Sequence, residues 1–168
     1  YNSAEIAKKI YLEEHPDAKI HVIDSLSAGG EVDLIVRKLN HLVAEGLDFD
    51  QVVDAITAYR AKTKLLFVLA KVDNLVKKGR LSKLVGTVVG LLNIRMVGEA
   101  SKTGTLELLQ KARGQKKAIK AAFDELLKAG YAGGHITIAH RNNEKFIEQF
   151  SELAREKFAQ ASICLLYT

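Results

Sequence analysis

Segments with the apolar spacing of an α-helix alternate along this chain with short apolar runs of strand length. The helical spacing predicts helices at about 1–15, 31–45, 48–59, 115–128 and 143–160. The strand-length runs lie at 18–25, 64–70, 94–100, 105–113, 135–140 and 162–168. This alternation excludes a helical bundle and an all-β barrel. It predicts an α/β or α+β fold in which a mixed sheet has flanking helices.

Several predicted boundaries carry local signals. Asn2 with Glu5, and Asp48 with Gln51, have the spacing of a capping box at the start of a helix. Gly46 is expected to end the helix at 31–45. The turn sequence "SKTG" is expected to join strands 94–100 and 105–113 into a hairpin.

The composition narrows the class of protein. Of the 168 residues, 48% are hydrophobic and 27% are charged, which is typical of a folded chain with a real core. No run reaches the ~18 apolar residues of a membrane span, so stable membrane insertion is not expected. Cys164 is the one cysteine and has no partner for an internal disulfide. We therefore predict a buried structural thiol and a cytoplasmic protein.

Few residues point to catalysis. The histidines lack the spacing of metal ligands, so neither a metal nor a cofactor is expected. Ser25 and Ser27 follow the predicted strand at 18–25, and ligands of open α/β sheets gather beyond the carboxyl ends of strands. The same serines could instead cap the next helix. We consider Ser25, Ser27 and His140 candidate ligand-proximal residues, and a small-molecule phosphotransferase stays an alternative function.

The stretch "LVKKGRLSKLVGTVVGLLNIR" places positive charge beside an apolar run. A membrane anchor, a nucleic-acid groove or a pocket for an amphipathic anion would each give that pattern. The apolar run at 84–94 is too short for a membrane anchor and contains two glycines. A second basic cluster at 111–120 has no aromatic residue before Phe123 on which a base could stack. A nucleic-acid partner is therefore not expected, and a regulatory nucleic-acid-binding module stays an alternative.

Three motifs in this order and spacing resemble the DegV family of bacterial fatty-acid-binding proteins: "HVIDSLSAGGE", "KKGRLSKLVGTVVGLLNIR" and "KARGQKKAI". The most specific part is the Gly79–Ser82 core, which is followed by the apolar run and Asn93-Ile94-Arg95. The resemblance implies a two-lobe fold. It also implies a non-catalytic carrier that binds a fatty acid and presents the carboxylate to a separate fatty acid kinase. The acyl-phosphate product feeds phospholipid synthesis.

The resemblance also implies roles for individual residues. Arg80 corresponds to an arginine near the lipid headgroup, and Arg113 to one implicated in engaging the kinase or its product. A fatty acid needs an apolar wall beside a cationic rim. We expect the acyl chain to contact a set of small and aliphatic residues: Gly86, Val89, Gly90, Leu92 and Ile94. Lys78 stands where the family usually has glycine, and Met96 where it commonly has proline.

The family's Ser-Gly-Thr motif and its closing histidine loop have no counterpart in this sequence. Because these segments supply groups for the carboxylate, we expect the chain to be the middle part of a longer DegV protein. Residues 1–60 would then be the end of the first lobe with its connecting helices. Residues 61–168 would be the second lobe, which binds the lipid tail.

Overall fold

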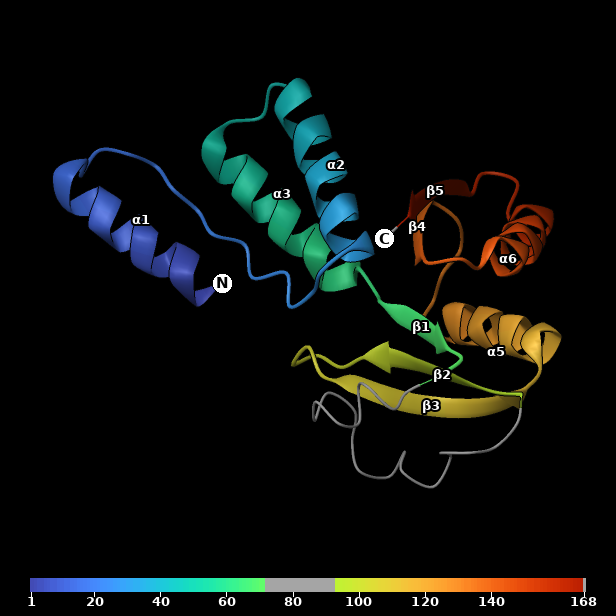
Figure 1. The fold of residues 1–168 in the computed structure, drawn as a ribbon. Helices are drawn as coiled ribbons and strands as arrows, with labels where there is room; N and C mark the ends of the chain where they lie inside the picture. Colours follow the sequence, from blue (N-terminus) through green and yellow to red (C-terminus); the bar gives the residue numbers. More distant parts are fainter. Residues whose placement is uncertain (72–92, 168) are drawn as a thin grey trace.

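The computed structural model describes residues 1–71 and 93–167, and its elements form layers (Figure 1). The helices are α1 (Asn2–Glu14), α2 (Gly30–Ala44), α3 (Phe49–Lys62), α5 (Gln115–Lys128) and α6 (Glu144–Lys157). The strands are β1 (Leu66–Leu69), β2 (Ile94–Ala100), β3 (Leu106–Arg113), β4 (His135–His140) and β5 (Ser162–Tyr167). The mixed α/β class predicted from the sequence is confirmed.

The strands form two sheets. An antiparallel sheet has the order β1-β2-β3, and a parallel sheet pairs β4 with β5. The helix α5 packs against all three strands of the antiparallel sheet and also contacts α6, which packs on β4. The pair α2–α3 lies beyond the parallel sheet, where α2 contacts β4. In Figure 1, α5 lies directly above the antiparallel sheet, and α6 lies beside β4 and β5.

The main core lies where α5 meets the antiparallel sheet. Five residues of α5 are buried there: Ala118, Ile119, Ala121, Ala122 and Phe123. They pack with Val97 of β2, Ala112 of β3, and Phe150 and Ala154 of α6. A separate cluster around Ile35, Leu42 and Ile56 joins α2 to α3.

Most predicted boundaries match the structure. The helix α5 begins and ends where the apolar spacing predicts. Asp48 and Gln51 form both hydrogen bonds of a capping box, at 2.9 and 3.0 Å. Gly46 follows the end of α2 with φ of 79°, a conformation that suits glycine. The hairpin of β2 and β3 turns through 101–105, where the Ser101 N–H donates to the Thr105 carbonyl.

Two local predictions are wrong. Asn2 lies inside α1 rather than capping it, because the N-cap is Tyr1 and no side chain bonds there. The segment at 18–25 is not a strand in the described part of the chain. A strand needs a neighbour for its backbone groups, and no described strand pairs with this segment.

A one-residue irregularity interrupts the pairing of β2 with β3. Val97 pairs with Gln110, but the next residue, Gly98, pairs with Leu108. Leu109 is therefore an extra residue on β3, as in a β-bulge. The bulge decides which side chains of β3 share a face with which side chains of β2.

Candidate lipid-binding site

The two faces of the antiparallel sheet differ in what covers them. Residues paired across antiparallel strands share a face, and the face alternates along each strand. Val68, Val97 and Ala112 therefore lie on the face that packs against α5. We call the opposite side the apolar sheet face. Its apolar side chains gather around the buried Met96, and they are Phe67, Leu69, Ile94, Leu106 and Leu108.

The apolar sheet face is uncovered by any described helix. All members of its cluster come from β1, β2 and β3. An apolar surface on this scale needs something to exclude water from it. The face can therefore form one wall of a site for an apolar ligand.

Positive charge lies at one end of this face. Arg113 pairs with Ile94, and Lys111 pairs with Met96, so both cationic residues share the face of their apolar partners. Both residues are exposed. The β-bulge produces this arrangement, because without the bulge Leu109 would pair with Val97, and the alternation from Leu106 and Leu108 would bring Gln110 and Ala112 to this face.

The start of α5 adds to the positive potential at the same end. The helix begins directly after Arg113, at the N-cap Gly114, whose φ is 82°. No side chain caps this end, and the first turn contains no acidic residue. It contains Lys116 and Lys117 instead. The helix dipole and these charges favour an anion near Arg113.

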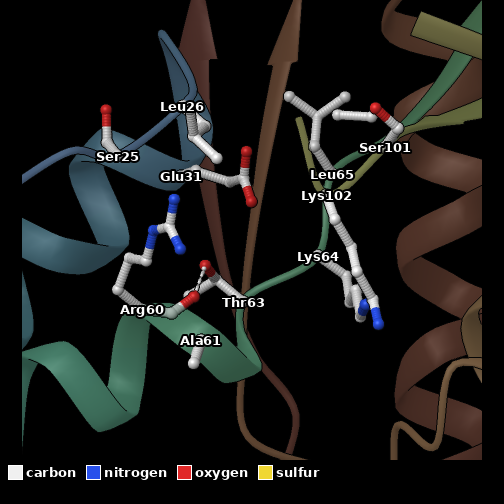
Figure 2. Close-up of a pocket in the computed structure, with 11 residues that line it drawn as sticks. Ser25, Leu26, Glu31, Arg60, Ala61, Thr63, Lys64, Leu65, Ser101 and Lys102 are labelled. Carbon is white, nitrogen blue, oxygen red and sulfur yellow. Dashed lines mark hydrogen bonds between the residues drawn. The ribbon is translucent and has the colours of Figure 1, made fainter. Parts of the chain in front are cut away.

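A second concave region lies between the end of α3, the loop at 25–26 and the hairpin turn of β2 and β3 (Figure 2). Its volume is about 270 Å³. Three cationic residues line it, Arg60, Lys64 and Lys102, with one acidic residue, Glu31. Figure 2 shows Arg60 on the side of Ser25, whereas Lys64 and Lys102 extend together on the other side.

The two predicted serines form a local turn. The Ser25 hydroxyl donates to the Ser27 carbonyl at 3.1 Å, and the Ser27 N–H donates to the Ser25 hydroxyl oxygen at 3.4 Å. Ser25 lines the cavity of Figure 2, and Ser27 does not. Neither serine caps α2, since its N-cap is Gly29 and no side chain bonds there.

His140 lies at the end of β4, in another part of the molecule. It lines a groove of about 600 Å³ between α6 and the parallel sheet. Glu144, Glu148 and Glu152 line the same groove with one cationic residue, Arg155. Acidic side chains disfavour a carboxylate ligand, so this groove differs in character from the Arg113 end of the apolar sheet face.

A polar network joins α2 to the parallel sheet. The Asp33 carboxylate accepts from Arg37 Nε at 2.8 Å and from the Thr137 hydroxyl of β4 at 3.0 Å. The bond from Arg37 lowers the pKa of Asp33, and Asp33 in turn raises the pKa of Arg37. The Arg37 guanidinium also lies 3.2 Å from Cys164 Sγ on β5. This thiol is half-buried, whereas the sequence predicted a buried one.

Within 1–71 and 93–167, no cluster of three or more metal-ligating side chains is present. In the same ranges, no helix has the length and apolar character needed to cross a membrane.

The comparison with known families decides the classification. The family model described as "Uncharacterised protein, DegV family" matches residues 1–168, the whole chain. The chain belongs to the DegV family. The family resemblance that the motifs predict is thereby confirmed.

Relatives with known structures share this DegV fold. A DegV domain-containing protein of Streptococcus pneumoniae is 74% identical over 100% of this chain and 60% of its own length. The S. pneumoniae Fatty Acid Kinase (Fak) B3 protein, loaded with linoleic acid, is 74% identical. It matches with a TM-score of 0.94 over 99% of this chain and 59% of its own.

A more distant DegV structure matches almost as well. The DegV family protein of Eubacterium eligens, loaded with heptadecanoic acid, is 38% identical and has a TM-score of 0.92. The match covers 100% of this chain and 61% of that protein. The chain therefore spans about three fifths of the length of these DegV relatives.

The structure distributes the predicted site residues of this DegV chain among three places. Ile94 and Arg113 lie side by side on the apolar sheet face, Ser25 lines the cavity of Figure 2, and His140 lines the acidic groove. Five further predicted residues lie outside the described ranges: Arg80, Gly86, Val89, Gly90 and Leu92. Their roles stay predictions.

Sequence reasoning missed most of the apolar sheet face. Leu69, Met96, Leu106 and Leu108 belong to it, together with Phe67, and none was a predicted site residue. The alternation of "TLELL" indicates that Leu106 and Leu108 share a face. It does not indicate that Lys111 and Arg113 join them, because the bulge changes the alternation at Leu109.

Proposed function

We propose that this protein binds a long-chain fatty acid and presents its carboxylate to a fatty acid kinase. The observation that carries the proposal is the pairing of Ile94 with Arg113 and of Met96 with Lys111 on the apolar sheet face. An apolar wall that ends in cationic groups suits a ligand with an apolar tail and one anionic head. The fatty acids bound by the S. pneumoniae and E. eligens relatives support the same ligand class.

In this proposal the tail and the head have different roles. Burying each methylene contributes about 0.8 kcal/mol, so a long tail supplies most of the binding free energy. The head stays at the Arg113 end, where the α5 N-terminus and the lysines favour its charge. A carrier that holds its ligand by the tail leaves the carboxylate accessible to another protein.

The chemical step belongs to the kinase. A carboxylate oxygen bonds to the terminal phosphorus of a nucleoside triphosphate held by the kinase, and the nucleoside diphosphate leaves. The acyl-phosphate that forms is a precursor for phospholipid synthesis. Arg113, with Arg80, would stabilise negative charge that develops on the transferring phosphoryl oxygens. The carrier itself is not catalytic and acts in the cytoplasm of a bacterium.

The placement of the lobes is part of the proposal. Residues 1–60 would complete the first lobe, and residues 61–168 would hold the tail in the second. The carboxylate ligands from outside this chain would complete the head end of the site.

Arg113→Ala tests the proposal in the protein expressed from its complete gene. The variant should retain bound fatty acid, measured by native mass spectrometry, because the tail dominates affinity. With the kinase present it should lose most acyl-phosphate formation, and Arg113→Lys should recover only part because lysine lacks the planar fork. Lys120→Ala is the matched control, since Lys120 lies on α5 and pairs with Asp124 at 3.6 Å. Wild-type turnover in Arg113→Ala would contradict the proposed role of Arg113.

A further inference from the structure

Phe67 and Gly98 form a close pair on the apolar sheet face. They are partners across β1 and β2, and Gly98 is buried. A Cβ atom added at Gly98 would overlap the Phe67 ring at Cζ and the Glu107 carbonyl oxygen, and would lie 2.9 Å from Phe67 Cε1. Gly98 does not have a positive φ. Glycine is therefore needed at this position for space, because the ring rests directly on the backbone.

The ring lies partway along the face from its cationic end. Ile94, the partner of Arg113, is four residues from Gly98 on β2. Four residues of strand span roughly 13 Å. A fully extended long-chain acyl tail is longer than this, so a tail with its carboxylate at Arg113 meets the Phe67 ring before it ends. Leu108, the partner of Gly98 on β3, lies level with the ring, and beyond it the same face continues with Leu106.

We infer that Phe67, resting on Gly98, is a specificity-determining residue that sets the depth of the acyl-chain site and so the longest tail accepted. This inference rests on the proposed function and adds the chain-length class of the ligand to it. Because the ring lies against the backbone of Gly98, the acyl-chain site is shallow between Met96 and Leu108. A smaller side chain at position 67 deepens the wall, and a ring raised by a side chain at position 98 narrows the space.

The inference predicts opposite changes for the two partners. Phe67→Ala opens the volume of a phenyl ring, and each additional methylene buried there should raise affinity about fourfold. A tail longer by two methylenes should therefore gain roughly fifteenfold in relative occupancy. Phe67→Leu should shift the preference in the same direction by less. Gly98→Ala should shift it toward shorter tails.

The experiment is a competition among saturated fatty acids that differ stepwise by two methylenes. The protein from its complete gene is incubated with an equimolar mixture, and native mass spectrometry gives the fraction of each bound species. Val68→Ala is the matched control, because Val68 is the next residue on β1 and packs toward α5 on the opposite face. It should lower stability without changing the distribution of bound tails.

The outcomes separate the inference from the function on which it rests. A shift to longer tails in Phe67→Ala and Phe67→Leu, with none in Val68→Ala, supports the inference. Stoichiometric binding with the wild-type distribution in both Phe67 variants overturns the inference and leaves the proposed function standing. Absence of bound fatty acid in the wild-type protein overturns the proposed function itself. If Phe67→Ala fails to fold, Phe67→Leu decides the question, because it retains an apolar side chain on the face.

Discussion

The two faces of the antiparallel sheet share the same strands but differ in chemistry. The face toward α5 packs Val97, which is fully buried, against helix residues such as Phe123 and Ala118. The apolar sheet face has one buried side chain, Met96, and half-buried neighbours that contact no described helix. The first face is packed within the fold, whereas no helix of the described residues packs on the second. In the proposed function, alternate residues of the same strand therefore serve stability and ligand binding.

The largest expected effect compares two phenylalanines on the two sides of the sheet. Phe123 is 3% exposed in the main core, so Phe123→Ala should lower the free energy of unfolding by about 3–5 kcal/mol. Phe67 is only half-buried, and Phe67→Ala should cost no more than about half of that. Denaturant unfolding of both variants, without added lipid, measures the difference. Equal losses would show that the apolar sheet face is as much a part of the core as the α5 face.

Two consecutive residues of β3 allow the two faces to be compared with a smaller expected change in stability. The Gln110 amide donates to the Glu125 carboxylate on α5 at 2.7 Å, and Gln110→Ala should cost about 1–2 kcal/mol of stability. Lys111 is exposed on the other face, so Lys111→Ala should change stability by less than about 0.5 kcal/mol. Lys111→Ala should instead weaken fatty-acid binding, measured by calorimetry. A stability loss in Lys111→Ala equal to that of Gln110→Ala would erase the functional distinction between the faces.

The smallest expected effect is on the pH dependence of stability, and it involves residues away from both faces of the sheet. The hydrogen bond from Arg37 lowers the pKa of Asp33 in the folded state. This carboxylate therefore stabilises the fold above the pKa of its unfolded form, and the contribution is lost as the pH falls below about 4. Asp33→Asn should remove that part of the acid sensitivity in thermal unfolding measured from neutral to acidic pH. An identical pH profile in wild type and Asp33→Asn would exclude Asp33 as its source.

Local signals predicted the helices and the hairpin well because their causes are local. The limits of α5 follow from apolar spacing and from Gly114 and Gly130 at its ends, and the Asp48 capping box involves residues three apart. The extended segment at 18–25 was predicted to be a strand because its apolar content fits one. Pairing depends on a neighbour that the segment itself does not encode.

The candidate site could be predicted only in part. The family motifs led to Arg113 and Ile94, and the structure places these two residues side by side. The set of apolar residues around Met96 depends on the pairing of three strands, which local sequence patterns do not give. The cavity of Figure 2 combines Arg60 and Lys64, which are close in the sequence, with Lys102 of the distant hairpin turn, so its full charge could not be read from any one stretch.

The extra residue on β3 makes the faces of the residues after it depend on how the strands pair as well as on the sequence. Deleting Leu109 removes no charge and no buried group, since this side chain is 39% exposed. It would restore simple alternation along β3 and keep Lys111 and Arg113 on the face of Leu106 and Leu108, because the pairs on either side of the bulge are already consecutive on β2. A slip that paired Leu109 with Val97 would instead exchange their faces with those of Gln110 and Ala112. In evolutionary terms, DegV proteins that retain the cationic end of this face should therefore tolerate the loss of this residue as well as its substitution.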